Sequence, residues 1–144
     1  MTVVAIAHPN IALAKYWGKR PGAGNIPAVP SLSVTLAGLT TRTEVDLLPG
    51  TAEDRLTING RTISCEPGGK TGNVFQELRE LAKSEARFDV RSTNDFPTAS
   101  GLASSASGFA ALVVGCAAAL GLDASTEQLA LVGMRGSASA ARSF

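Results

Sequence analysis

The sequence has 144 residues, which is the size of one folded domain. Apolar residues make up 44% and charged residues 17%, an ordinary globular composition that excludes a disordered or fibrous chain. The formal net charge of +1 gives no long-range field for nucleic acid, so an anionic ligand has to be bound by local clusters of side chains.

The amino-terminal part of the chain predicts strands. The apolar runs 3–7 and 11–14 are short and are bounded by Pro9 and Gly18, which suits buried strands better than a helix. Residues 43–47 alternate between uncharged and acidic side chains, the period-two pattern of a strand with one solvent-facing side.

A hairpin is predicted over residues 56–63. Asn59 and Gly60 at its centre can supply the two positive φ angles of a tight primed turn. The stretch 21–30 before these elements is rich in proline and glycine, and we expect it to be a loop rather than a domain boundary.

The rest of the chain predicts three helices and one more strand. Residues 74–82 have the spacing of an amphipathic surface helix, and residues 88–92 follow as a strand. The alanine-rich segment 104–120 reads as a long buried helix, and Ser125 with Gln128 forms a capping box at the start of a third helix. The expected apolar stripe of the first helix consists of Val74, Phe75, Leu78, Leu81 and Ala82.

Strands come mainly first and helices mainly later, without regular βα alternation. This order favours an α+β layer architecture over a doubly wound sheet. We expect one folded unit over residues 1–144, with no internal repeat or linker.

The cellular setting is predicted from cysteine usage and from the start of the chain. The two cysteines, Cys65 and Cys116, are typical of a reduced, cytoplasmic protein. The apolar start has no basic leader, and His8 and Asn10 interrupt it before a membrane-spanning length is reached. We therefore expect no targeting segment and no membrane partner.

The segment 96–112 is the strongest candidate for a phosphate site. Pro97 and Gly101 shape a turn, small residues let a ligand approach the backbone, and a long helix begins immediately afterwards. Free N–H groups at a helix start favour an anion, and Ser104 and Ser105 could add hydroxyl donors or hold a metal ion. The alternative is a small-residue helix packed closely on the sheet.

Two polar clusters lie near the ends of the chain. Lys15, Tyr16 and Lys19 place two ammonium groups and a phenol within five positions, which suits a diphosphate, although a solvated basic turn has the same composition. The second cluster offers two hydroxyls and a planar guanidinium to a carboxylate or phosphate, with a polar helix end as its alternative. It consists of Ser137, Ser139 and Arg142.

Two features of the sequence resemble catalytic motifs but are rejected as catalytic candidates. Gly69, Lys70 and Thr71 look like the end of a Walker A loop, but the first glycine of that motif would fall on Ser64. His8, the only histidine, follows an apolar strand and is expected to be a hydrogen-bonded structural residue, which weighs against hydrolase and metal-ligand chemistry.

The segment from Pro97 resembles the ATP-binding motif of the GHMP kinase superfamily, in which a proline and three further residues precede glycine-leucine, one residue and serine-serine-alanine. The matching residues are Pro97, Gly101, Leu102, Ser104, Ser105 and Ala106. Three further segments, 10–19, 25–36 and 135–143, narrow the resemblance to the diphosphomevalonate decarboxylase family. The resemblance implies an amino-terminal GHMP kinase domain of the ribosomal protein S5 domain 2-like class, with a mixed sheet covered by helices on one side.

The resemblance implies a lyase of the mevalonate pathway that uses ATP and Mg²⁺ to convert mevalonate diphosphate to isopentenyl diphosphate. It assigns catalysis to Lys15, Ser105, which could also contact Mg²⁺, and Arg142. The ATP-binding residues that it implies are Pro97, Ser100, Gly101, Leu102, Ala103, Ser104 and Ser105. The implied substrate-binding residues are Tyr16, Trp17, Gly18, Lys19, Lys70, Ser137, Ala138, Ser139, Ala140, Ala141 and Arg142.

Two positions, Ala138 and Ala141, depart from the usual sequence of the family. Ala138 and Ala141 stand where the family commonly has glycine and cysteine, and Lys70 stands where eukaryotic relatives carry an arginine. The aspartate that acts on the substrate hydroxyl is expected beyond Phe144, in a carboxy-terminal GHMP domain that the chain lacks. For the full-length enzyme we expect a homodimer. The alternatives are a sister kinase or decarboxylase acting on mevalonate or its monophosphate, and a non-catalytic nucleotide-binding fragment.

Overall fold

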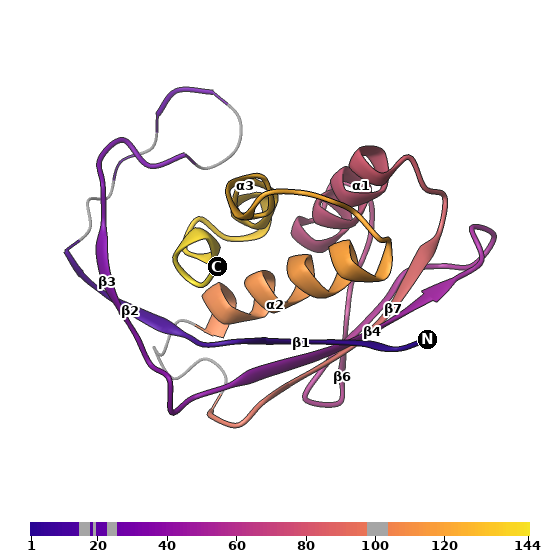
Figure 1. Cartoon of the computed structure of the whole chain (residues 1–144), viewed down its shortest axis with the longest axis horizontal. Coiled ribbons are helices and arrows are strands. Elements are labelled where there is room, and N and C mark those ends of the chain that lie inside the picture. Colours follow the sequence, from indigo (N-terminus) through magenta and orange to yellow (C-terminus); the bar gives the residue numbers. More distant parts are fainter. Residues whose placement is uncertain (15–17, 19, 23–25, 98–103) are drawn as a thin grey trace.

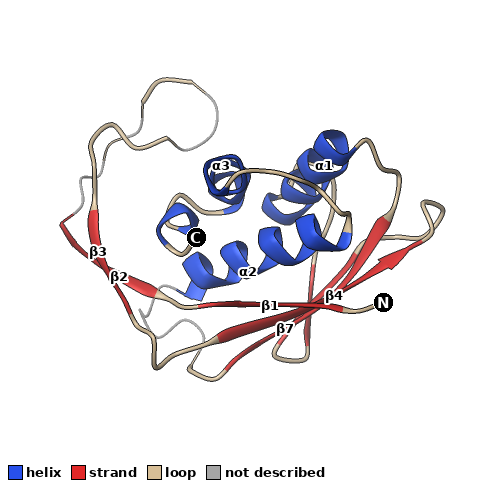
Figure 2. Ribbon diagram, viewed as in Figure 1, coloured by secondary structure: helices blue, strands red, loops and turns tan. Residues whose placement is uncertain are grey.

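In a computed structural model, which describes residues 1–14, 18, 20–22, 26–97 and 104–144, a sheet is covered on one face by helices (Figures 1 and 2). The α+β class and the one-sided helical layer are therefore confirmed. The elements are β1 (Val3–Ala7), β2 (Asn10–Ala14), β3 (Leu32–Thr35), β4 (Thr41–Leu48), β5 (Arg55–Ile58), β6 (Arg61–Ile63), α1 (Lys70–Ala82), β7 (Arg87–Asn94), α2 (Ser104–Ala119), α3 (Thr126–Gly136) and the 3-10 helix η1 (Ala140–Arg142).

The main sheet has the strand order β1-β4-β7-β5-β6. It is mixed, because β5 runs parallel to β7 while the other neighbouring strands run antiparallel. β2 and β3 form a separate antiparallel ribbon, with Ile11 opposite Val34, and β3 is a strand that the sequence did not predict. Each predicted strand is present, and the hairpin turn has positive φ at Asn59 (48°) and Gly60 (77°), as expected.

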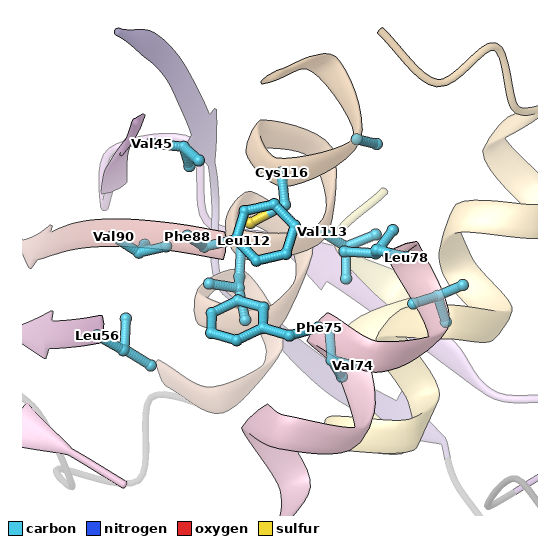
Figure 3. Close-up of a cluster of buried hydrophobic side chains, with 12 residues drawn as sticks. Val45, Leu56, Val74, Phe75, Leu78, Phe88, Val90, Leu112, Val113 and Cys116 are labelled. Atoms are coloured by element: carbon cyan, nitrogen blue, oxygen red, sulfur yellow. The ribbon is translucent and has the colours of Figure 1, made fainter. Parts of the chain in front are cut away.

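The core lies between the sheet and helices α1 and α2 (Figure 3). Phe75 of α1 and Phe88 of β7 are fully buried, and their ring centroids are 4.8 Å apart. Helix α2 lies close to the sheet at Gly115, where an added Cβ would lie 2.9 Å from a methyl carbon of Val45. The small residues of α2 thus let this helix pack tightly on β1 and β4.

The helical stripe of α1 is narrower than predicted. Val74, Phe75 and Leu78 are fully buried, but Leu81 is 47% exposed. Val74 and Leu81 are seven residues apart and project in the same direction, so the elements that pack on α1 cover its earlier turns and not its last. The expected burial of Leu81 was wrong for that reason.

The start of α3 and the environment of His8 agree with the sequence analysis. The Ser125 hydroxyl accepts from the Gln128 backbone N–H at 3.2 Å, and the Gln128 side chain accepts from the Ser125 N–H at 2.9 Å, which confirms the capping box. Nδ1 of His8 donates to the Leu39 carbonyl at 2.8 Å, which confirms a hydrogen-bonded histidine. Among the described residues, no helix is both long and apolar enough to cross a membrane.

Candidate functional site

The start of α2 meets the end of α3 through serine hydroxyls. The Ser137 hydroxyl donates to Oγ of Ser105 at 3.3 Å, and Oγ of Ser139 lies 2.9 Å from Oγ of Ser137. Ser105 belongs to the predicted phosphate motif and the other two belong to the predicted carboxylate cluster. The fold therefore joins, in one row of hydroxyls, two segments that were identified separately in the sequence.

Arg142 lies directly after this row, in η1. Its backbone N–H donates to the Ser139 carbonyl at 3.2 Å, and its Nε donates to Oδ1 of Asn10 at 2.9 Å. The Asn10 amide in turn donates to the Ser143 hydroxyl at 2.5 Å. The two Nη groups of Arg142 make no hydrogen bond with the described residues, so the outer edge of the guanidinium remains available to a ligand.

Asn10 is a residue of the site that the sequence analysis did not identify. It is 0% exposed, although it begins strand β2 within an otherwise apolar run. A buried carboxamide requires hydrogen-bond partners, and Asn10 finds them in Arg142 and Ser143, more than 130 positions away. The signal available in the sequence was this single amide between two apolar strands.

A cavity of about 470 Å³ opens beside the start of α2. Its polar lining includes Ser104 and Ser105 of α2, and Lys70 at the start of α1. The apolar part of its wall is formed by Leu56, Ile58, Ile63, Phe109 and Leu112. A cavity whose wall is mostly apolar and carries several polar groups suits an organic ligand that bears a charged group.

The residues 69–71 begin helix α1, with Gly69 as N-cap. Lys70 lines the same cavity as Ser104 and Ser105. Ser139 and Arg142 are not among the residues that line this cavity. Its assignment as a contact to the substrate diphosphate stays a prediction.

Part of the predicted site falls outside the described residues. This applies to Lys15, Tyr16, Trp17 and Lys19, and to residues 100–103 of the phosphate motif. Two predicted site residues next to these gaps are described. The Gly18 carbonyl accepts a hydrogen bond from the Ala28 N–H at 3.0 Å, and Pro97 is exposed. Ala138 is exposed, while Ala140 is fully buried and Ala141 partly buried within η1.

The face of the sheet away from the helices carries paired charges. Arg91 donates to Asp46 at 2.6 Å and to Asp89 at 2.9 Å. Hydrogen bonds from Thr2 and Arg91 hold the pKa of the Asp46 carboxyl below its ordinary value. These charges satisfy one another at the surface, so they offer no competing candidate for the anion site.

Comparison with known proteins identifies the family. The diphosphomevalonate decarboxylase-like N-terminal domain matches residues 7–144. The chain belongs to this family. Curated relatives include the diphosphomevalonate decarboxylases of Eremothecium gossypii, 42% identical over 94% of the chain, and Saccharomyces cerevisiae, 40% identical over 99% of the chain. The chain spans only 37% and 39% of the lengths of these two relatives.

Solved structures of diphosphomevalonate decarboxylases have the same fold. The Enterococcus faecalis enzyme is 41% identical, with a TM-score of 0.86 over 99% of this chain and 44% of its own. The Trypanosoma brucei enzyme is 30% identical, with a TM-score of 0.86 over 99% of this chain and 39% of its own. A further structure, with a TM-score of 0.85 and 41% identity, is a complex with MVAPP, AMPPCP and magnesium.

The residues of this chain fit a magnesium ion that is held mainly by nucleotide phosphates. The described residues contain no group of three or more histidine, cysteine, aspartate or glutamate side chains that could hold a metal by themselves. Mg²⁺ commonly binds through one or two protein oxygens, waters and substrate phosphates. The exposed hydroxyl of Ser105 can supply such an oxygen at the start of α2.

Proposed function

We propose that the chain is the ATP- and substrate-binding part of a diphosphomevalonate decarboxylase. The reaction converts mevalonate 5-diphosphate and ATP into isopentenyl diphosphate, ADP, phosphate and carbon dioxide. The observation that carries the proposal is the contact between Ser105 and Ser137, which brings the ATP motif beside the cluster that ends in Arg142. The membership of the family supports the same reaction.

The nucleotide fits the start of α2 and the neighbouring cavity. Free backbone N–H groups and the helix dipole favour its phosphates near Ser104 and Ser105. The apolar wall that includes Leu56 and Phe109 can then cover the base. The ammonium-bearing residue Lys70, which lines the same cavity, adds positive charge for the phosphates.

The other substrate fits between the two polar clusters. The guanidinium of Arg142 has its Nε committed to Asn10, so its two Nη groups can engage the substrate carboxylate side by side. By the resemblance, the segment from Tyr16 to Lys19 binds the diphosphate at the other end of the substrate. The hydroxyls of Ser137 and Ser139 lie between Arg142 and the nucleotide site, where the substrate 3-hydroxyl has to meet the γ-phosphate.

The chemistry requires positioning rather than a protein nucleophile. Transfer of the γ-phosphoryl group to the tertiary 3-hydroxyl replaces a poor leaving group with a good one, and the hydroxyl proton passes to a base. The C–O bond then breaks and phosphate leaves with the bonding electrons. The C–C bond to the carboxylate breaks next, and its electron pair forms the new double bond as carbon dioxide departs.

This chain supplies the anchors for these steps. Arg142 orients the carboxylate, and the hydroxyls of Ser105 and Ser137 hold the phosphate end against the substrate. By the resemblance, Lys15 lies beside the reacting group, and the base is the aspartate expected outside the chain. Mg²⁺, when bound with ATP, neutralises phosphate charge.

A decarboxylase acting on a monophosphate is the second candidate. The phosphomevalonate decarboxylase of Haloferax volcanii is 38% identical over 99% of this chain, nearly as similar as the diphosphate enzymes. Of the residues that the resemblance assigns to the substrate diphosphate, Tyr16, Trp17 and Lys19 lie outside the described part of the structure. The homodimer and the cytoplasmic setting likewise remain predictions.

The test joins this chain, in one polypeptide, to the carboxy-terminal remainder of the Enterococcus faecalis relative. ADP and carbon dioxide are then measured with mevalonate, its 5-phosphate and its 5-diphosphate as substrates. We expect one carbon dioxide for each ADP, with the diphosphate as the preferred substrate. Formation of ADP without carbon dioxide would identify a sister kinase, and preference for the 5-phosphate would identify the second candidate. Turnover unaffected by Ser105→Ala and by Gly101→Val would exclude the assigned ATP loop.

A further inference from the structure

A buried chain of hydrogen bonds lies behind the cavity and links three elements. Thr41 at the start of β4 donates to Oδ1 of Asn94 at the end of β7 at 2.6 Å. The hydroxyl of Ser107, in the first turn of α2, lies 2.7 Å from the Thr41 hydroxyl. Thr41 and Ser107 are both 0% exposed, whereas Asn94 lines the cavity. Neither hydroxyl belongs to the ATP motif or to the substrate cluster.

The number of protons available determines which group donates in each of these hydrogen bonds. A hydroxyl has one proton to donate, and Thr41 gives its proton to Asn94, so Thr41 must accept from Ser107. The reverse direction would require Ser107 to donate to the Ser104 carbonyl, which is 3.5 Å away. That contact is much longer than the 2.7 Å between the hydroxyls of Ser107 and Thr41. The order is therefore Ser107 to Thr41 to the oxygen of Asn94.

In this order of hydrogen bonds the amino group of Asn94 takes no part. Nδ2 of Asn94 makes no hydrogen bond with the described residues. Within the described part of the chain, no buried side-chain nitrogen or oxygen lacks a partner, so Nδ2 is accessible. Asn94 also lines the cavity, and Nδ2 is its accessible side-chain donor. The backbone N–H of Asn94, held at 2.9 Å by the Asn59 side chain, further restricts the residue.

We propose that Thr41 and Ser107 are positioning residues that hold the Asn94 amide with its NH₂ group toward the cavity, so that this wall reads a hydrogen-bond acceptor on the bound base. The inference rests on the proposed function, since it takes the cavity to hold the base of ATP. A purine offers ring nitrogens as acceptors in an otherwise apolar plane. An amide held in place by Thr41 favours a base that has a ring nitrogen opposite it, because a base without that nitrogen leaves the Asn94 donor without a partner.

The test compares binding of ATP with binding of 1-deaza-ATP, 3-deaza-ATP and 7-deaza-ATP, each of which lacks one ring-nitrogen acceptor. Calorimetry on the wild-type chain is expected to show one of the three analogues binding about tenfold more weakly than ATP, the others binding like ATP. In Asn94→Ala and in Thr41→Val, the ratio of the Kd of that analogue to the Kd of ATP is expected to fall close to one. Thr41→Ser, which keeps the hydroxyl, is expected to restore it.

Thr57→Val is the matched control. Thr57 lies between Leu56 and Ile58, which line the cavity, so its own side chain is on the opposite face of β5. We expect this variant to keep the wild-type ratio. Equal binding of ATP and all three analogues by the wild-type chain, or an unchanged ratio in Thr41→Val, would overturn the inference alone. Failure of the wild-type chain to bind ATP would contradict the proposed function and the inference together.

Discussion

The side chain of Arg142 is held from behind by Asn10, whose Oδ1 accepts a hydrogen bond from Nε at 2.9 Å. Asn10 is fully buried, so the bond is shielded from water. The carboxamide also donates to Ser143, which fixes both of its ends. Strand β2 and helix η1 thus share one polar connection, and this connection determines which edge of the guanidinium faces the ligand.

Replacement of Asn10 by alanine is expected to lower stability. The change leaves Arg142 Nε and the Ser143 hydroxyl without their partner, at a cost of about 1–3 kcal/mol in the free energy of unfolding. Urea denaturation measures it. Asn73→Ala is the control, because the Asn73 side chain makes one exposed hydrogen bond of 3.4 Å, and it should change stability by much less. Equal stability of the two variants would show that the Asn10 contacts contribute little.

Replacement of Arg142 by lysine is expected to weaken binding of the substrate carboxylate. Lysine keeps the charge but loses the planar pair of Nη donors, so affinity for mevalonate diphosphate should fall by about tenfold to a hundredfold. Isopentenyl diphosphate lacks the carboxylate and serves as the control ligand. Its affinity should not change. A parallel loss for both ligands would remove Arg142 from the carboxylate site.

The sequence allowed prediction of features that depend on neighbouring residues. The turn at Asn59 and Gly60 and the capping box at Ser125 and Gln128 depend on local backbone chemistry, and both are confirmed. The exposure of Leu81 was predicted wrongly, because helical spacing gives the direction of a side chain and not the extent of its packing partners.

Features that join distant segments could not be predicted from local patterns. The contacts of Asn10 with Arg142 and of Thr41 with Ser107 link residues that are far apart in the sequence. No local pattern indicates that these side chains pair, because only the packing of the folded chain brings them together. The phosphate motif was recognised because its residues are contiguous.

The two glycines of α2 should respond in opposite ways to alanine. At Gly115 an added Cβ would lie 2.9 Å from Val45 and 3.3 Å from Ala5, so overpacking is expected to cost about 1–3 kcal/mol. At Gly108 a Cβ meets nothing within 4 Å, and the better helix propensity of alanine should add about 0.5–1 kcal/mol. Thermal denaturation without ligand measures both. Stabilisation by Gly115→Ala would contradict the close packing of α2 on the sheet.

The thiol of Cys65 should react slowly in the folded protein. Burial, with a smaller contribution from the charge of Asp54, raises its pKa to about 11 from an ordinary value of 9.0. Between pH 9.0 and about 11 the thiol therefore stays protonated in the folded state but loses its proton in the unfolded state. The free energy of unfolding consequently falls as the pH rises through this range. At pH near 8.5, alkylation by iodoacetamide should be at least about tenfold slower in native than in urea-unfolded protein. Cys116→Ser isolates the Cys65 thiol, and equal rates in the two states would refute the shift.

Binding of both ligands to this chain tests the central claim most directly, because the claim is that Ser105 and the cluster from Ser137 to Arg142 form one site. Calorimetry follows AMPPCP with Mg²⁺, then mevalonate diphosphate added to the nucleotide complex. We expect the two ligands to bind together. Ser105→Ala should lower the affinity for the nucleotide about threefold to tenfold. Ser84→Ala should leave it unchanged, because the Ser84 hydroxyl contacts Ala86 instead. Mutually exclusive binding, or the same nucleotide affinity in wild type and Ser105→Ala, would contradict the account.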